Sequence, residues 1–345
     1  MQIGIFAFAG DEQACRLERA LNAQSPGTAA FFDLSLGTAA RATMGAGEAA
    51  WGGRDLTKLD IAFLHGFAYC DPVIPACGTG VDWSVWRFDY IAAQQKHTFL
   101  YSLFSELERR GVRVISPPAA HLQTFMKPLL LERLRRAGLN VPAAVCSNNM
   151  DAVREFCGRH ANAVWRPATG RAAYQRFTDR QREALVSLQK PPIIVAEAVD
   201  GPVVRGYLLQ GEPLLFLEKG APDCTGEERL EGFWEVDYAA LRPDLSRLAA
   251  EMNIPWLEVV FVAKDGKAWI YDVDADPLFE GLPTGHSEKL TALLAKSLLQ
   301  VGQTFLSADA VAAPPAKAVE TQRPTLFLRR MLRILFEFEQ SKYSK

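Results

Sequence analysis

The stretch WLEVVFVAKDGKAWIYDVDADP, residues 256–277, predicts a β-hairpin. Aromatic and β-branched residues dominate both halves, as is typical of strands, and the Asp-Gly pair at 265–266 is a common two-residue hairpin turn. Because a hairpin joins neighbouring antiparallel strands, we expect an antiparallel sheet in this part of the chain.

Three aspartates, Asp272, Asp274 and Asp276, stand at alternate positions near the end of this stretch. Side chains of a strand alternate between its two faces, so the three carboxylates are expected on one face and Val273 on the other. Such carboxylates repel each other unless water, a basic side chain or a cation compensates. Pro277 cannot donate to a sheet ladder and is expected to end the strand. Taken alone, the triplet is interpreted more simply as a charged strand end that runs into a solvated loop.

A fourth acid, Glu258, lies in the first strand of the same hairpin. The turn brings the chain back, so Glu258 is expected near Asp272 and Asp274. Hard oxygen ligands from adjacent strands suit Mg²⁺, which accepts carboxylates, waters and substrate phosphates. The hairpin therefore predicts the outline of a nucleotide–metal site.

The first 118 residues alternate between strand-like and helix-like segments. Buried strands are predicted at 3–8, 59–67 and 112–118, and helices at 10–23 and 88–111. This alternation is typical of a doubly wound parallel sheet.

The remainder of the chain predicts an α+β organisation, so a domain boundary is expected near residues 117–118. Helices are predicted at 125–138, 151–160, 179–189, 238–252 and 290–302, and extended segments at 163–170, 193–199 and 203–220. We divide the chain into residues 1–118, 119–192, 193–303 and 304–345. The last part comprises a linker without large apolar residues (307–324) and an amphipathic terminal helix (326–345). The apolar face of this helix predicts packing within the protein or a homodimer, ahead of contact with an anionic membrane surface.

Composition narrows the classes of function. With 345 residues the chain is long enough for two or three structural units, and a net charge of −2 gives no reason to expect a nucleic-acid groove. The sequence has neither a signal-peptide pattern at Met1 nor an apolar run of membrane-spanning length, which predicts a cytoplasmic protein. Six cysteines form no CxxC pair, so a zinc site is not expected.

Six short motifs follow one another between residues 112 and 302. They are VISPP with Lys127 and RRAGLNVPA, then AVWRP, VAEAV, VVRGYLL, WLEVVFV, and DVDADPLFEGLP with its Glu280-Gly281 pair. In this order and spacing they resemble the motifs of the ATP-grasp superfamily, in particular the ribosomal-protein S6 glutamate-ligase-like carboxylate–amine ligases. The resemblance implies a pre-ATP-grasp-like domain over 1–118, followed by a two-subdomain ATP-grasp fold.

The resemblance also implies how ATP is held. Lys127 and Arg166 would contact the phosphates, and the backbone of Glu197, Ala198 and Val199 would hold the adenine edge. Taken alone, Lys127 is interpreted more simply as an ordinary solvated lysine at the start of a helix, whereas Arg166 in an apolar strand requires an acidic or phosphate partner.

The implied metal ligands are Glu258, Asp272 and Asp274, which would hold Mg²⁺ against the ATP phosphates. Arg205 would steady the γ-phosphate, the acyl phosphate or a substrate carboxylate; alternatively it pairs with Asp200 or Glu218. The implied reaction is attack of a carboxylate on the γ-phosphate, followed by capture of the acyl phosphate by an amine. The carboxylate and amine substrates would be small molecules or peptides.

Three departures from the family pattern support a second hypothesis. Arg166 stands where the family has lysine, the segment ATGRAAYQRF has few of the expected glycines, and Asp272 and Asp274 replace Glu and Asn. The alternative is therefore a degenerate ATP-grasp protein that binds nucleotide without ligase turnover and acts as a binding or interaction module.

Overall fold

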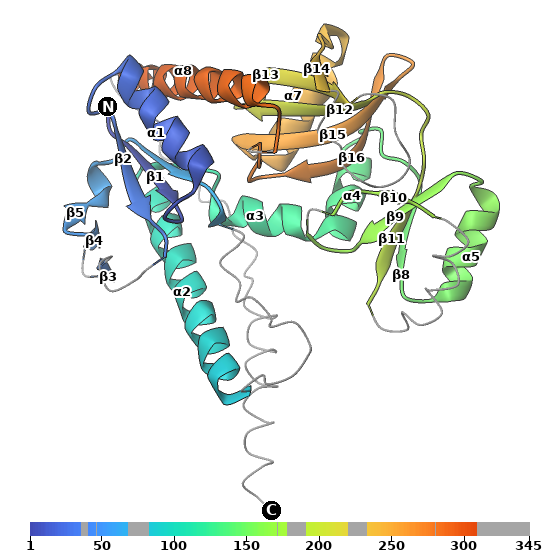
Figure 1. The fold of residues 1–345 in the computed structure, drawn as a ribbon, viewed down its shortest axis with the longest axis horizontal. Helices are drawn as coiled ribbons and strands as arrows, with labels where there is room; N and C mark the ends of the chain where they lie inside the picture. Colours follow the sequence, from blue (N-terminus) through green and yellow to red (C-terminus); the bar gives the residue numbers. More distant parts are fainter. Residues whose placement is uncertain are drawn as a thin grey trace, which may run out of the picture. The chain divides into compact units, whose positions relative to one another are not determined.

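The N-terminal part of the chain forms a four-stranded parallel sheet with helices on both faces (Figure 1). This computed structural model describes residues 1–35, 41–45, 47–67, 83–170, 172–177, 191–219, 233–279 and 281–308. The strands β1 (Ile3–Ala7), β2 (Ala29–Asp33), β6 (Ile61–Leu64) and β7 (Arg113–Ile115) are ordered β2-β1-β6-β7. On β1, Ile5 lies in the same core as helix α1 (Glu12–Gln24), while the next residue, Phe6, lies in the core of helix α2 (Trp83–Arg109). This arrangement is the predicted doubly wound sheet.

A small antiparallel sheet in this region was not predicted. It comprises β3 (Ala42–Gly45), β4 (Glu48–Trp51) and β5 (Arg54–Asp55), and the 3-10 helix η1 (Leu56–Lys58) follows it. The strands have four, four and two residues, and within them only Ala49 and Trp51 are buried apolar residues. Such segments are too short for a period of two to be recognised.

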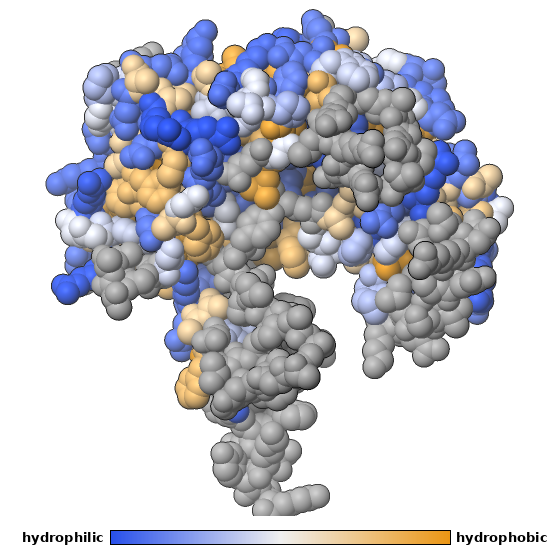
Figure 2. All heavy atoms as spheres, in the orientation of Figure 1, coloured by the Kyte–Doolittle hydropathy of each residue, from blue (hydrophilic) through white to orange (hydrophobic). Residues whose placement is uncertain are grey.

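The side chains of α2 that the structure describes as buried lie in the second half of the helix. Leu100, Leu103 and Phe104 are fully buried, whereas Phe88 and Ile91 are 75% and 41% exposed. Figure 2 shows apolar surface, coloured orange, over the exposed part of this helix.

The middle of the chain contains an antiparallel sheet in the order β10-β9-β11-β8. Its strands are β8 (Ala144–Ser147), β9 (Ala163–Pro167), β10 (Gln175–Arg176) and β11 (Ile193–Glu197), and helix α5 (Met150–Arg159) packs on it through Val153 and Phe156. The helix predicted at 125–138 is confirmed as α4 (Lys127–Arg136), which begins at Lys127 because Pro128 has no amide hydrogen and is tolerated only in the first turn of a helix. The short helix α3 (Pro118–Phe125), which precedes it, was not predicted.

The C-terminal part holds a five-stranded antiparallel sheet in the order β14-β13-β12-β15-β16. Its strands are β12 (Val203–Leu209), β13 (Glu212–Lys219), β14 (Phe233–Glu235), β15 (Trp256–Lys264) and β16 (Lys267–Asp274). The predicted hairpin is confirmed as β15–β16, with Asp265 and Gly266 at positive φ values of 52° and 69°, as a type I′ turn requires. Strand β16 ends at Asp274, before the predicted stop at Pro277.

Each face of the five-stranded sheet contributes to a different core. On one face, Val259 and Val273 pack with α4, η3 (Ala239–Leu241) and α7 (Arg242–Met252). On the other face, Tyr207 and Trp256 pack with α1, the parallel sheet and α8 (Thr284–Ala308), which is longer than the predicted 290–302. The predicted helix at 179–189, Glu280, and the tail beyond residue 308 lie outside the described residues.

Candidate functional site

The register of three strands gathers charged side chains on one face of the five-stranded sheet. On β15 and β16, Glu258 is paired with Asp274, and Val260 with Asp272. On β12, Arg205 is paired with Val260. Paired residues of an antiparallel sheet point to the same face, so Arg205, Glu258, Asp272 and Asp274 lie on one face. The alternation of residues predicted the shared face of Asp272 and Asp274.

A β-bulge interrupts the alternation within β16. Val260 and Phe261 are consecutive on β15, but their partners Asp272 and Ile270 are two residues apart. Tyr271 is therefore an extra residue in the ladder. Bulges re-aim side chains, and this one places Tyr271 directly beside the charged face.

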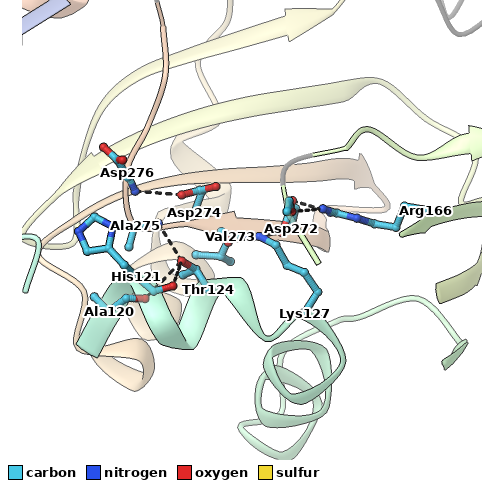
Figure 3. Close-up of polar contacts among 11 residues, drawn as sticks. Ala120, His121, Thr124, Lys127, Arg166, Asp272, Val273, Asp274, Ala275 and Asp276 are labelled. Atoms are coloured by element: carbon cyan, nitrogen blue, oxygen red, sulfur yellow. Dashed lines mark hydrogen bonds and ion pairs between the residues drawn. The ribbon is translucent and has the colours of Figure 1, made fainter. Parts of the chain in front are cut away.

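Asp272 accepts hydrogen bonds from two cations that come from different elements (Figure 3). Lys127 Nζ, at the start of α4, donates to Asp272 Oδ1 at 2.6 Å and to the carbonyl oxygen of Val273 at 3.0 Å. Arg166 Nη1, on β9, donates to Asp272 Oδ2 at 2.6 Å, and its Nη2 donates to the carbonyl oxygen of Gly170 at 2.6 Å. Both carboxylate oxygens of Asp272 are thus bound by basic side chains.

Both cations are removed from water. The Lys127 and Arg166 side chains are 3% and 2% exposed, and Asp272 is 16% exposed. Arg166 Nε is buried and has no hydrogen-bond partner within the part of the chain that the structure describes. Buried charges require compensation. Among the described residues two cations share the carboxylate of Asp272, so this end of the site is able to accept an anion.

At the opposite end of the site, two carboxylates lie on neighbouring strands. Glu258 and Asp274 face each other across the strands, where like charges destabilise a sheet. Arg205 Nη1 lies 3.6 Å from Glu258 Oε1, and its guanidinium lies over the Phe233 ring at 5.6 Å. Arg205 thus has Glu258 as an ion-pair partner. Carboxylates on adjacent strands are the kind of ligand that Mg²⁺ accepts.

The three predicted metal ligands do not form one cluster. Within the described ranges, no three His, Cys, Asp or Glu side chains lie close enough together to hold a metal ion. Glu258 and Asp274 are adjacent, while Asp272 is bound by Lys127 and Arg166. Mg²⁺ commonly takes only one or two protein carboxylates and completes its shell with waters and phosphates. The Glu258–Asp274 pair therefore fits Mg²⁺ held jointly with a phosphate ligand.

The predicted adenine-binding backbone is bonded to a tyrosine that the sequence analysis missed. The Tyr271 hydroxyl donates to the carbonyl oxygen of Glu197 at 2.7 Å and accepts from the amide of Val199 at 2.7 Å. The amide of Ala198 donates instead to the carbonyl oxygen of Asn162. Burial raises the pKa of Tyr271 to about 12, so the hydroxyl is protonated at neutral pH. In the sequence Tyr271 is one strand-forming residue among several.

Comparison with known proteins identifies the architecture. At the level of sequence the chain matches no protein-family model and no curated protein. Its structure is similar to that of the ATP-grasp ligase PsnB complexed with minimal precursor, Mg and ADP, with a TM-score of 0.71 and 18% identity over 87% of this chain and 98% of that one. The chain has the ATP-grasp fold.

Two further structures share this ATP-grasp fold. The macrocyclase MdnC bound with precursor peptide MdnA from Microcystis aeruginosa MRC aligns with a TM-score of 0.65 and 15% identity, over 87% of this chain and 100% of MdnC. A RimK domain protein ATP-grasp from Sphaerobacter thermophilus DSM 20745 aligns with a TM-score of 0.55 and 13% identity, over 86% of this chain and 98% of that one. The predicted family resemblance is confirmed at the level of the fold.

In this ATP-grasp fold the third aspartate of the triplet has a structural role. Asp276 Oδ1 lies 3.0 Å from Nδ1 of the buried His65 and accepts from the amide of Gly66 at 3.2 Å. His65 Nε2 lies 3.4 Å from Asp11 Oδ2. The amide of Asp276 in turn donates to Asp274 Oδ1 at 3.0 Å (Figure 3). The parallel sheet is thus tied to the chain just beyond β16, next to the candidate site.

Proposed function

We propose that the protein is an ATP- and Mg²⁺-dependent ligase that joins a carboxylate to an amine through an acyl-phosphate intermediate. The observation that carries this proposal is the convergence of Lys127 and Arg166 on Asp272, beside the Glu258–Asp274 pair. Phosphoryl transfer depends on positioning and on charge stabilisation more than on a general base, and buried cations beside paired carboxylates supply both.

The proposed roles follow from the two ends of the site. Lys127 and Arg166 bind the ATP phosphates, and Arg166 Nε, which has no hydrogen-bond partner among the described residues, offers one more donor. Glu258 and Asp274 would hold Mg²⁺, which would neutralise phosphate charge, and Asp272 would offer a further carboxylate ligand. Arg205, adjacent to Glu258, orients the γ-phosphate or the substrate carboxylate.

The proposed reaction has two transfers. A substrate carboxylate oxygen bonds to the γ-phosphorus as the bond to ADP breaks. An amine then attacks the acyl carbon, phosphate leaves, and the amine proton passes to solvent. Because PsnB and MdnC were solved with precursor peptides, peptide carboxylates and amines are the first substrates to test, ahead of small molecules.

The test is the Mg²⁺ dependence of ATP binding in Glu258→Gln. The neutral amide should weaken Mg²⁺-dependent binding by roughly 10- to 100-fold, the worth of a charge-assisted contact. Glu212→Gln changes an exposed carboxylate in the same sheet and serves as the matched control. Calorimetric titration with ATP, with and without Mg²⁺, measures the effect. Equal affinities in both variants would refute the metal assignment.

A second candidate is nucleotide binding without turnover. The observation in its favour is that Asp272, its two cations and the backbone of Glu197 and Val199 already have partners within the chain. Release of ADP in the presence of peptide carboxylates and amines supports the ligase. Tight Mg²⁺-dependent ATP binding without ADP release supports the alternative.

A further inference from the structure

One hydroxyl group satisfies a backbone acceptor and a backbone donor at the end of β11. The two groups are the carbonyl of Glu197 and the amide of Val199, and each lies 2.7 Å from the Tyr271 oxygen. A phenolic hydroxyl donates one hydrogen bond and accepts others, so Tyr271 meets both needs at once.

This backbone pair is complementary to the edge of adenine. Adenine offers an amino donor at N6 beside an acceptor at N1, which match a carbonyl and an amide from residues two apart. Guanine offers an acceptor at O6 beside a donor at N1, which would face like groups. The Tyr271 hydroxyl therefore presents to Glu197 and Val199 the same donor and acceptor that adenine would present.

The position of Tyr271 is fixed by packing as well as by hydrogen bonds. The bulge in β16 places it next to Asp272. Its ring meets Tyr174 edge to face at a centroid distance of 5.3 Å, and the Arg166 guanidinium lies over the Tyr174 ring at 5.4 Å. Tyr271 therefore connects the backbone of β11 to the cation cluster.

We propose that the Tyr271 hydroxyl occupies the adenine-reading backbone in the nucleotide-free protein, and that the base must displace it to bind. The inference rests on the proposed function, because it takes Glu197 and Val199 as the adenine contacts. Tyr271 thereby sets the apparent affinity for the base: while it is bonded to β11, only the fraction of molecules with a free backbone pair can accept adenine.

The cost of displacing the Tyr271 hydroxyl can be measured as a change in the affinity for adenine. If the hydroxyl bonds favour the occupied state by roughly tenfold, adenine binds about tenfold more weakly than it would to the free backbone. Tyr271→Phe keeps the ring against Tyr174 and removes only the hydroxyl. It should bind adenosine and ATP roughly tenfold more tightly than the wild-type protein, and its guanosine affinity should not change.

The experiment is calorimetric titration of the full chain with adenosine, guanosine and ATP. Adenosine lacks phosphates, so it reports on the base contacts separately from Lys127 and Arg166. Tyr238→Phe is the matched control, because it loses the hydroxyl bond to Glu218 at 2.9 Å without touching β11. If Tyr271→Phe melts below the assay temperature, Tyr271→Met provides a second variant without a hydroxyl.

The outcomes separate the two proposals. Tighter adenosine binding by Tyr271→Phe but not by Tyr238→Phe supports displacement. Unchanged or weaker adenosine binding by Tyr271→Phe, with ATP still bound by the wild type, overturns the displacement alone. Failure of ATP to bind any of the proteins overturns the proposed function and this inference together.

Discussion

Replacing Asp272 by Asn removes the only carboxylate that Lys127 and Arg166 are seen to bind in the described part of the chain. The Asn side chain can accept from one cation through its oxygen, but its amino group then faces the other. Removal of one partner from a buried ion pair typically destabilises a protein by about 3–5 kcal/mol. Because Asp272 is 16% exposed, we expect the lower end, about 3 kcal/mol, which corresponds to a fall in Tm of roughly 6–12 °C.

The matched control is Glu132→Gln. Glu132 also bridges two basic side chains, Arg135 at 2.6 Å and Arg136 at 3.3 Å, but all three are at least 41% exposed. An exposed cluster of this kind contributes about 0–1 kcal/mol. Thermal melts of both variants, without and with inorganic pyrophosphate, measure the difference.

Pyrophosphate should stabilise Asp272→Asn more than it stabilises the wild type, because Lys127 and Arg166 no longer have a competing carboxylate. If the melting temperature falls no further in Asp272→Asn than in Glu132→Gln, the buried cluster is not formed in solution. If pyrophosphate stabilises both proteins equally, the two cations do not form a phosphate site.

Two other predictions use the same assays. Arg166→Lys keeps a cation beside Asp272 and should retain ATP turnover. Arg166→Ala should lower ATP turnover by at least about tenfold, which is the contribution of one charged hydrogen bond. Equal turnover in both variants and the wild type would exclude contact of Arg166 with phosphate. His65→Ala removes the imidazole partner of the buried Asp276 and should lower the free energy of unfolding by about 3 kcal/mol. The control, His286→Ala, removes a partly exposed pair with Glu235 and should change the free energy of unfolding by less than about 1 kcal/mol. Similar melting temperatures for the two histidine variants would show that the His65–Asp276 contact adds no stability.

Local patterns in the sequence were sufficient for most elements of the fold. The hairpin turn at 265–266 and the burial of Val273 follow from turn chemistry and from a period of two, which are properties of consecutive residues. The same reasoning predicted β1 and β6 as buried strands. It failed for β3–β5, which are too short to show a period, and for the eight-residue helix α3, which was not predicted.

No described helix combines the length and apolar composition needed to cross a membrane.

The parallel N-terminal sheet and the antiparallel C-terminal sheet were both predicted from the order of their segments, because alternating strands and helices favour parallel pairing and hairpins favour antiparallel pairing.

The sequence by itself determined that Asp272 and Asp274 share a face of β16, since that depends only on strand periodicity. The bulge in β16 decided that Glu258 joins them, because the register set by the turn at 265–266 would otherwise pair Glu258 with Val273. Tertiary structure alone decided what each carboxylate binds. Asp272 meets Lys127 and Arg166, which are 145 and 106 residues away, and the Tyr271 hydroxyl reaches Val199, 72 residues away. Such contacts depend on how separate sheets and helices pack and on one bulge in β16, and neither leaves a periodic signal in neighbouring residues.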